Sequence, residues 1–440
     1  MLPPRTTAEI PITGAKLSTV VPGTVRGENV DRELTNMDLA VKFHYIKGVY
    51  FFKRITTDTD DKPVIPSDGG ITIQELKRPL FELLDWFFPA AGRIRRSDAS
   101  GHPYIKCNDA GVRIIEAFCE ELTVEECLDM VEMGCSFHDR LCYNQVLGPD
   151  IGFSPLVLLQ FTRFKCGGLS VGLSWAHMLG DIASASMFMN TWAQIMAGHV
   201  PKDSMHVTSP KQSKPFSVEE LDPPPENHWS LPANIGQNMR TRCFKVSAKQ
   251  LNLLMSNTCG KKAANFSRFE ILSAVIWKSL SQIRKNSSSK VVTICWYKYP
   301  RGDKYRIPNN KSMVLSTVER DSEVNNVSEL AFLIAERKIG EDKAVKEMVG
   351  KVDYLVYGAN LTLVNLEDVE IYELQMIGQK PIFANFSIEG VGNEGLVLVH
   401  SGGPKNGKDD DINGRVVTVV LPEDELAHLE NELKANWNIA

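Results

Sequence analysis

Residues 169–181 read LSVGLSWAHMLGD, and they are the most informative stretch of this chain. The apolar run Leu169–Ser174 predicts a buried strand. After Asp181 the apolar residues keep the spacing of a helix, at Ala185, Phe188, Met189, Trp192, Ile195 and Met196. His177 and Asp181 are therefore predicted to lie on a strand-to-helix turn, which is a common location for chemistry.

The pattern H-x-x-x-D is weak evidence by itself, because the chain has 9 histidines and a second match at residues 199–203. That match has no strand before it, so we interpret it as chance. At the end of a buried strand, the neutral imidazole of His177 can take a proton from a hydroxyl or an amine. The alternatives are a structural, hydrogen-bonded histidine and a metal site, although no third metal ligand is indicated.

The composition excludes several classes of function. A length of 440 residues predicts two domains, and 43% hydrophobic with 23% charged residues is typical of a folded globular protein. The net charge of −5 means that the protein as a whole has no positive potential that would attract nucleic acid. No apolar run approaches the ~18 residues that a transmembrane segment needs. The 9 scattered cysteines form no C-x-x-C pair, which favours reduced thiols in the cytosol.

A proline-rich crossover divides the chain into two near-equal halves. Residues 210–232 hold six prolines, which lock φ and remove backbone donors. We therefore predict an N-terminal domain at 1–209, a linker at 210–232 and a C-terminal domain at 233–440.

Both halves show mixed helices and strands. In the first half, residues 153–164 and 169–174 predict a hairpin around Gly167-Gly168, and a helical stripe from Leu80 to Phe87 predicts a helix with Pro79 in its first turn. In the second half, Ser267 and Glu270 predict a capping box. Further strands are predicted at residues 291–296, 360–364, 396–400 and 416–421, and a last helix after Pro422. The fold class is therefore α/β, with two mixed layers facing one another.

Several landmarks together resemble the plant BAHD acyltransferase superfamily over nearly the full length. They are, in family order, LTNMD at 34–38, FPAAGR at 88–93, the H-x-x-x-D of His177 and Asp181, and the helix at 269–279 with Trp277. Within that superfamily the chain is most similar to the Eceriferum/Glossy wax-biosynthesis group. That likeness is carried by residues 148–157, 164–169, 172–177 and 357–362.

The resemblance implies two chloramphenicol-acetyltransferase-like domains, each a mixed sheet with helices, and a channel at their interface. Acyl-CoA would be the substrate or ligand, and no bound cofactor or metal is implied. The family's histidine, here His177, deprotonates the acceptor, which then attacks the thioester. The family's aspartate, here Asp181, supports the turn and pairs with an arginine of the second domain.

This sequence departs from the family at two points. The motif D-F-G-W-G is replaced by Gln375, Met376, Ile377, Gly378 and Gln379, although the flanking residues match. Where the family has its arginine, this chain has Lys298, which cannot form the planar two-point bond of a guanidinium with a carboxylate. Either Lys298 or Arg301 then compensates the charge of Asp181, or this carboxylate is more hydrated than in the active members of the family.

Two functions follow from the resemblance, and these residues leave open whether the chain is itself an enzyme. In the first, it acts with the condensing enzyme (ketoacyl-CoA synthase) of the fatty-acid elongase to extend very-long-chain fatty acids for cuticular wax. It would then reach the cytosolic face of the endoplasmic reticulum through that partner, or be cytoplasmic, and otherwise be a monomer. In the second, it is an acyl-CoA-dependent acyltransferase acting on an alcohol or amine, with His177 as the general base.

Overall fold

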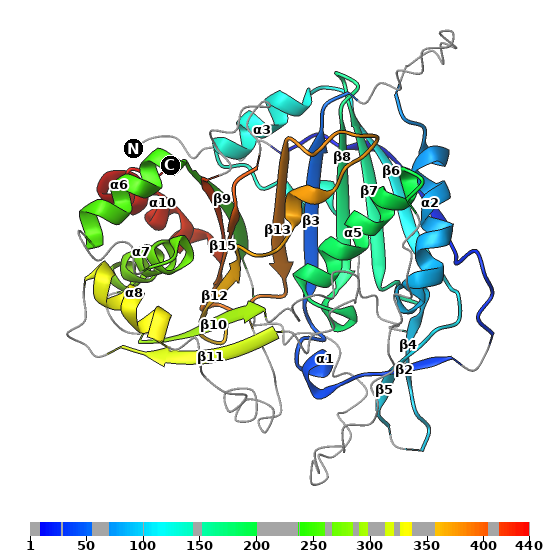
Figure 1. Ribbon diagram of the computed structural model, residues 1–440, viewed down its shortest axis with the longest axis horizontal. Coiled ribbons are helices and arrows are strands. Elements are labelled where there is room, and N and C mark those ends of the chain that lie inside the picture. The colour runs from blue at the N-terminus through cyan, green and yellow to red at the C-terminus, as the bar shows by residue number, and fades with distance from the viewer. Residues whose placement is uncertain are drawn as a thin grey trace.

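The computed structural model describes residues 9–27, 30–54, 70–99, 101–143, 152–199, 236, 238–259, 266–284, 290–297, 313–320, 326–336, 357–403 and 413–439. The predicted linker at 210–232 and the residues Lys298 and Arg301 lie outside this part of the chain. The described residues form two six-stranded sheets and one three-stranded sheet (Figure 1). The predicted α/β class with two mixed layers is confirmed.

The first sheet contains the predicted hairpin. Its strands, in spatial order, are β1 (Thr13–Val20), β6 (Val112–Cys119), β7 (Val157–Phe164), β8 (Leu169–Ala176), β3 (Tyr45–Phe52) and β13 (Phe383–Glu389). All neighbours are antiparallel except β6 and β7. The hairpin of β7 and β8 turns at Gly167, whose φ of 81° lies in the left-handed region.

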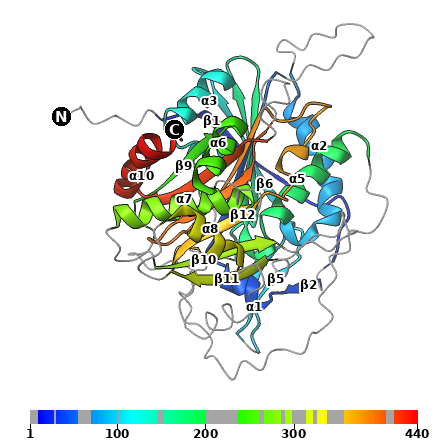
Figure 2. The ribbon, with the colours of Figure 1, turned by 60° about the vertical axis from the view of Figure 1, so that its left-hand side comes forward.

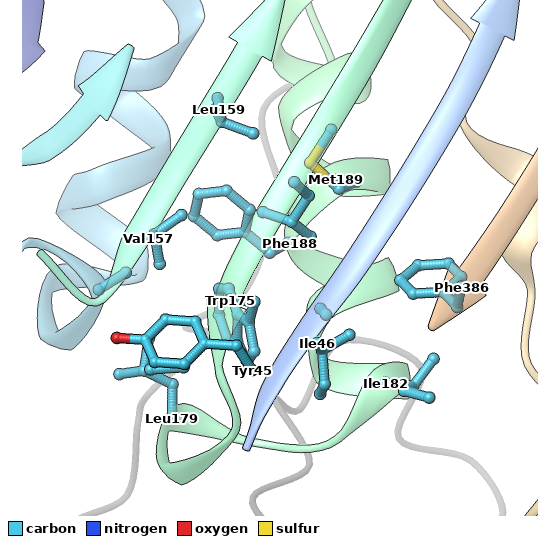
Figure 3. Close-up of a cluster of buried hydrophobic side chains, with 14 of the residues drawn as sticks. Tyr45, Ile46, Val157, Leu159, Trp175, Leu179, Ile182, Phe188, Met189 and Phe386 are labelled. Atoms are coloured by element: carbon cyan, nitrogen blue, oxygen red, sulfur yellow. The ribbon is translucent and has the colours of Figure 1, made fainter. Parts of the chain in front are cut away.

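Helices α2 (Ile73–Trp86) and α5 (Ile182–Met196) pack beside each other on one face of this sheet (Figure 1). Figure 3 shows the core beneath α5, where Trp175 of β8 meets Phe188 of the helix with ring centroids 5.2 Å apart. Shorter helices of the first half are α1 (Asn36–Ala40), η1 (Phe88–Ala91), α3 (Val124–Glu132), α4 (His138–Leu141) and η2 (His177–Leu179).

The start of α2 differs from the prediction, which placed Pro79 in the first turn. The helix begins at Ile73, and Pro79 lies buried in its interior. The reason is a capping box that the prediction missed: Thr72 Oγ1 accepts from the Glu75 N–H at 3.3 Å, and Glu75 Oε2 accepts from the Thr72 N–H at 2.6 Å. This box caps backbone N–H groups that have no partner within the helix. It therefore starts the helix about two turns before the apolar stripe that begins at Leu80.

The second sheet confirms the predicted strands of the second half to within one or two residues at each end. Its order is β11 (Met313–Glu319), β10 (Val291–Tyr297), β12 (Leu361–Leu366), β14 (Leu396–Ser401), β15 (Arg415–Pro422) and β9 (Met239–Val246). β10, β12 and β14 are parallel neighbours.

The helices of the second half gather at the end of the molecule away from α2 and α5 (Figure 1 and Figure 2). They are α6 (Ala248–Cys259), α7 (Arg268–Ile283), α8 (Val327–Glu336) and α10 (Glu423–Trp437), with the short η6 (Ile371–Glu373) nearer to β13. The capping box predicted for α7 is present, with Ser267 Oγ accepting from the Glu270 N–H and Glu270 Oε2 accepting from the Ser267 N–H. None of the helices in the described ranges is long and apolar enough to cross a membrane.

One strand crosses between the halves. β13 belongs to the second half of the sequence but pairs with β3 of the first sheet from Phe383↔Phe51 to Glu389↔Tyr45. It also lies beside β15, where the buried Asn385 donates from Nδ2 to Thr418 Oγ1 at 2.8 Å. The two sheets are therefore joined by a strand from the second half of the chain.

A tight turn precedes this crossing strand, at the residues that replace the family motif. The N–H groups of Met376 and Gln379 each donate to the other residue's carbonyl, at 2.9 and 3.0 Å. Ile377 and Gly378 have φ values of 48° and 75°, which is the pattern of a type I′ turn. A β-branched side chain in the left-handed region is strained, and Ile377 is also 36% exposed.

We predict that Ile377→Asn stabilises the protein by about 1 kcal/mol, because Asn-Gly is the preferred pair for this turn and asparagine tolerates a positive φ. Urea unfolding would measure the change. Ile377→Val keeps the β-branch and is the matched control, for which we expect no gain. An equal gain in both variants would contradict the proposed strain.

Candidate functional site

The predicted turn lies between β8 and α5, at the C-terminal end of an interior strand of the first sheet. His177 is the first residue of η2, and its N–H donates to the carbonyl of His44 at 3.1 Å. The Gly180 N–H closes the turn on the His177 carbonyl at 3.0 Å. His177 and Asp181 are both 0% exposed. The structure thus places the H-x-x-x-D pair on one buried turn.

Asp181 is the N-cap of α5. Its Oδ1 accepts from the N–H and from the hydroxyl of Ser184, both at 2.9 Å. A carboxylate at this position satisfies an orphan donor of the helix and is stabilised by the helix dipole. Asp181 therefore has a local structural role in shaping the turn that carries His177.

Two further contacts hold the same turn from outside. Arg32 Nη1 donates to the Leu179 carbonyl at 3.1 Å, and Trp175 Nε1 donates to the Gly180 carbonyl at 3.0 Å. Arg32 comes from the three-stranded sheet of β2 (Asp31–Glu33), β5 (Pro103–Lys106) and β4 (Arg93–Arg96). The backbone around the imidazole is therefore restrained by a side chain of the small sheet and by one of β8.

A tyrosine of the second half meets the imidazole. Tyr357 Oη lies 2.8 Å from His177 Nε2 and 3.3 Å from Met313 Sδ of β11. Tyr357 is 0% exposed, and this burial, reinforced by the nearby Cys295 and Asp181, holds its pKa well above the usual value of a phenol. The phenol is therefore neutral, with its hydroxyl directed at the candidate base.

His44 completes the cluster. Its ring packs edge-on against Tyr357 with centroids 4.8 Å apart, and its centroid is 6.5 Å from that of His177. Burial, and secondly the proximity of His177, lower the pKa of His44 to about 3, so it is neutral at physiological pH. Its Nδ1 lies 3.4 Å from the carbonyl oxygen of Glu389, at the end of β13.

The other residues singled out in the sequence lie elsewhere. Residues 375–379 form the turn before β13, which is fastened by Tyr372: its hydroxyl donates to the Ala384 carbonyl at 3.1 Å and accepts from the Ala384 N–H at 3.2 Å. Lys298 and Arg301 are outside the described residues, so their pairing with Asp181 stays a prediction. No group of three potential metal ligands is found among the residues that the structure describes.

Sequence reasoning gave no role to Tyr357 or His44. Tyr357 was noted only as part of a stretch that resembles the Eceriferum group. It contacts His177 across 180 residues of sequence, so no spacing rule could have joined them. No local signal in the sequence marks Tyr357 as part of a site.

Comparisons with known proteins show the family of this chain. A model described as the Transferase family matches residues 10–299. Protein ECERIFERUM 2 of Arabidopsis thaliana is 41% identical, covering 96% of this chain and 98% of that protein, and Protein ECERIFERUM 26-like of the same plant is 36% identical, covering 96% of both. The crystal structure of vinorine synthase shares the fold, with a TM-score of 0.67 at 18% identity over 95% of this chain and 96% of that one. The chain therefore belongs to the plant BAHD transferase family and, within it, groups with the ECERIFERUM proteins.

Proposed function

We propose that this protein acts with the condensing enzyme (ketoacyl-CoA synthase) of the fatty-acid elongase, extending very-long-chain fatty acids that become cuticular wax. Through that partner it would lie at the cytosolic face of the endoplasmic reticulum. Its likeness to the ECERIFERUM proteins over 96% of the chain supports this proposal. The protein would hold or present an acyl group, or alter the shape of the condensing enzyme, and would not need its own proton transfer.

The observation that carries the proposal is the state of the candidate base. A general base must come within hydrogen-bond reach of the proton it removes from the acceptor. His177 Nε2 instead lies 2.8 Å from the hydroxyl of Tyr357, in a site where both residues are completely buried. The imidazole is thus engaged by the protein itself.

The second candidate is an acyl-CoA-dependent acyltransferase. The retained imidazole and the intact turn around it favour this function, because the fold still places His177 at the end of β8. His177 would take the proton of an alcohol or amine, which would attack the thioester carbon and release the CoA thiol. For this to happen, the Tyr357 hydroxyl would first have to leave Nε2.

We predict that His177→Ala leaves chain-length extension within about twofold of the wild type when each is co-expressed with a matching condensing enzyme in yeast. A working general base contributes about 10²–10⁴-fold, so the acyltransferase function predicts a loss of that size. The chain lengths of the acyl products would be measured by gas chromatography, normalised to the amount of protein. His177→Gln, which keeps a polar side chain, controls for a folding defect caused by the smaller residue.

We predict that the purified protein binds a long-chain acyl-CoA, measured by calorimetry below the concentration at which the ligand forms micelles. Because each buried CH₂ contributes about 0.8 kcal/mol, stearoyl-CoA should bind at least tenfold more tightly than free CoA. His177→Ala should keep this affinity, since the imidazole is not needed to hold the chain. Equal affinity for stearoyl-CoA and free CoA would contradict an acyl-holding role.

A further inference from the structure

The Tyr357 hydroxyl occupies the place of a substrate group. A general base meets the hydroxyl that it deprotonates at about 2.6–3.2 Å. Tyr357 Oη lies 2.8 Å from His177 Nε2, within this range. An acceptor alcohol or amine in productive contact with Nε2 would therefore have to stand where the phenol oxygen already is.

A general base needs a free lone pair, and the hydrogen bond of this pair leaves none on Nε2. Tyr357 has a single O–H, which donates either to Nε2 or to a sulfur partner, namely Met313 Sδ at 3.3 Å or the side chain of Cys295. In the first arrangement the Nε2 lone pair accepts the phenol proton, and in the second Nε2 carries a proton and donates it to the phenol oxygen. In both arrangements Nε2 has no lone pair for an external acceptor.

Backbone contacts hold Tyr357 in this position. The Gly392 N–H donates to the Tyr357 carbonyl at 3.0 Å, and the Gly358 N–H donates to Thr362 Oγ1 at 3.2 Å. Gly358 has a φ of 88°, and a Cβ added there would lie 2.4 Å from the backbone of Gly392. Only glycine fits at 358, so the two backbone segments can approach closely and direct the tyrosine ring inward. The His44 ring then packs against the tyrosine edge-on.

We propose that Tyr357 is a positioning residue that withholds His177 from external acceptors, with its hydroxyl standing in for the acceptor at Nε2. This inference rests on the proposed non-catalytic function and gives it a physical cause. The base is retained as a partner in a buried hydrogen bond that joins the two halves of the chain. Loss of the phenol hydroxyl would free the Nε2 lone pair to accept a proton from another molecule.

The reactivity of His177 toward diethyl pyrocarbonate tests this proposal, because the reagent modifies the free lone pair of an imidazole. The full-length protein would be treated as wild type, Tyr357→Phe and Tyr357→Ala, and modified histidines would be quantified by peptide mass spectrometry. Tyr372→Phe is the matched control, since it removes another buried phenol hydroxyl that bonds to the Ala384 backbone. Exposed His428 and buried His400 serve as internal references for reagent dose and for folding in every sample.

We expect His177 to be protected in the wild type and in Tyr372→Phe. We expect it to react at least tenfold faster in Tyr357→Phe, and faster still in Tyr357→Ala, while His400 stays protected. Acceleration in Tyr357→Ala alone would show that the ring, not the hydroxyl, shields the imidazole and would overturn the proposal. So would unchanged reactivity in both variants, or a fast reaction in the wild type. The assay uses no condensing enzyme, so its result is independent of the yeast experiment.

Discussion

The pairing of β13 with β3 is the constraint on which the site depends. It carries a strand of the second half into the first sheet and ends with Glu389 opposite Tyr45, next to His44. The loop that follows β13 contains Gly392, whose N–H holds the carbonyl of Tyr357. The register of one strand pair therefore determines where Tyr357 stands relative to His177.

Two of the buried polar residues around His177 are uncharged. His44 is neutral because burial lowers its pKa to about 3, and Tyr357 is neutral because burial raises its pKa. The carboxylate of Asp181 accepts two hydrogen bonds from Ser184 of its own helix. Because His44 and Tyr357 are uncharged, neither carries the large desolvation cost of a buried ion. A catalytic site must instead keep a lone pair accessible to its substrate.

Residues 375–379 have a structural task in this chain, although they differ from the family motif that their position resembles. They make a tight turn, and Tyr372 fastens that turn to the start of β13 through Ala384. Ile377 adopts a left-handed φ that would suit glycine better. The turn thus leads the chain into β13 even with a poorly suited residue at its tip.

The sequence by itself determined the elements whose signals are local. The hairpin of β7 and β8, the turn that carries His177 and Asp181, the capping box of α7 and four strands of the second sheet all follow from apolar periodicity, glycines and caps within a few residues. The capping pair Thr72 and Glu75 overrides the preference of Pro79 for a first turn and leaves this proline in the helix interior. Only the tertiary structure decided that β13 joins the first sheet and that Tyr357 and His44 surround His177. These contacts depend on strand register and on backbone segments that are 180 residues apart in the sequence. Neither produces a pattern in the neighbouring residues of the sequence.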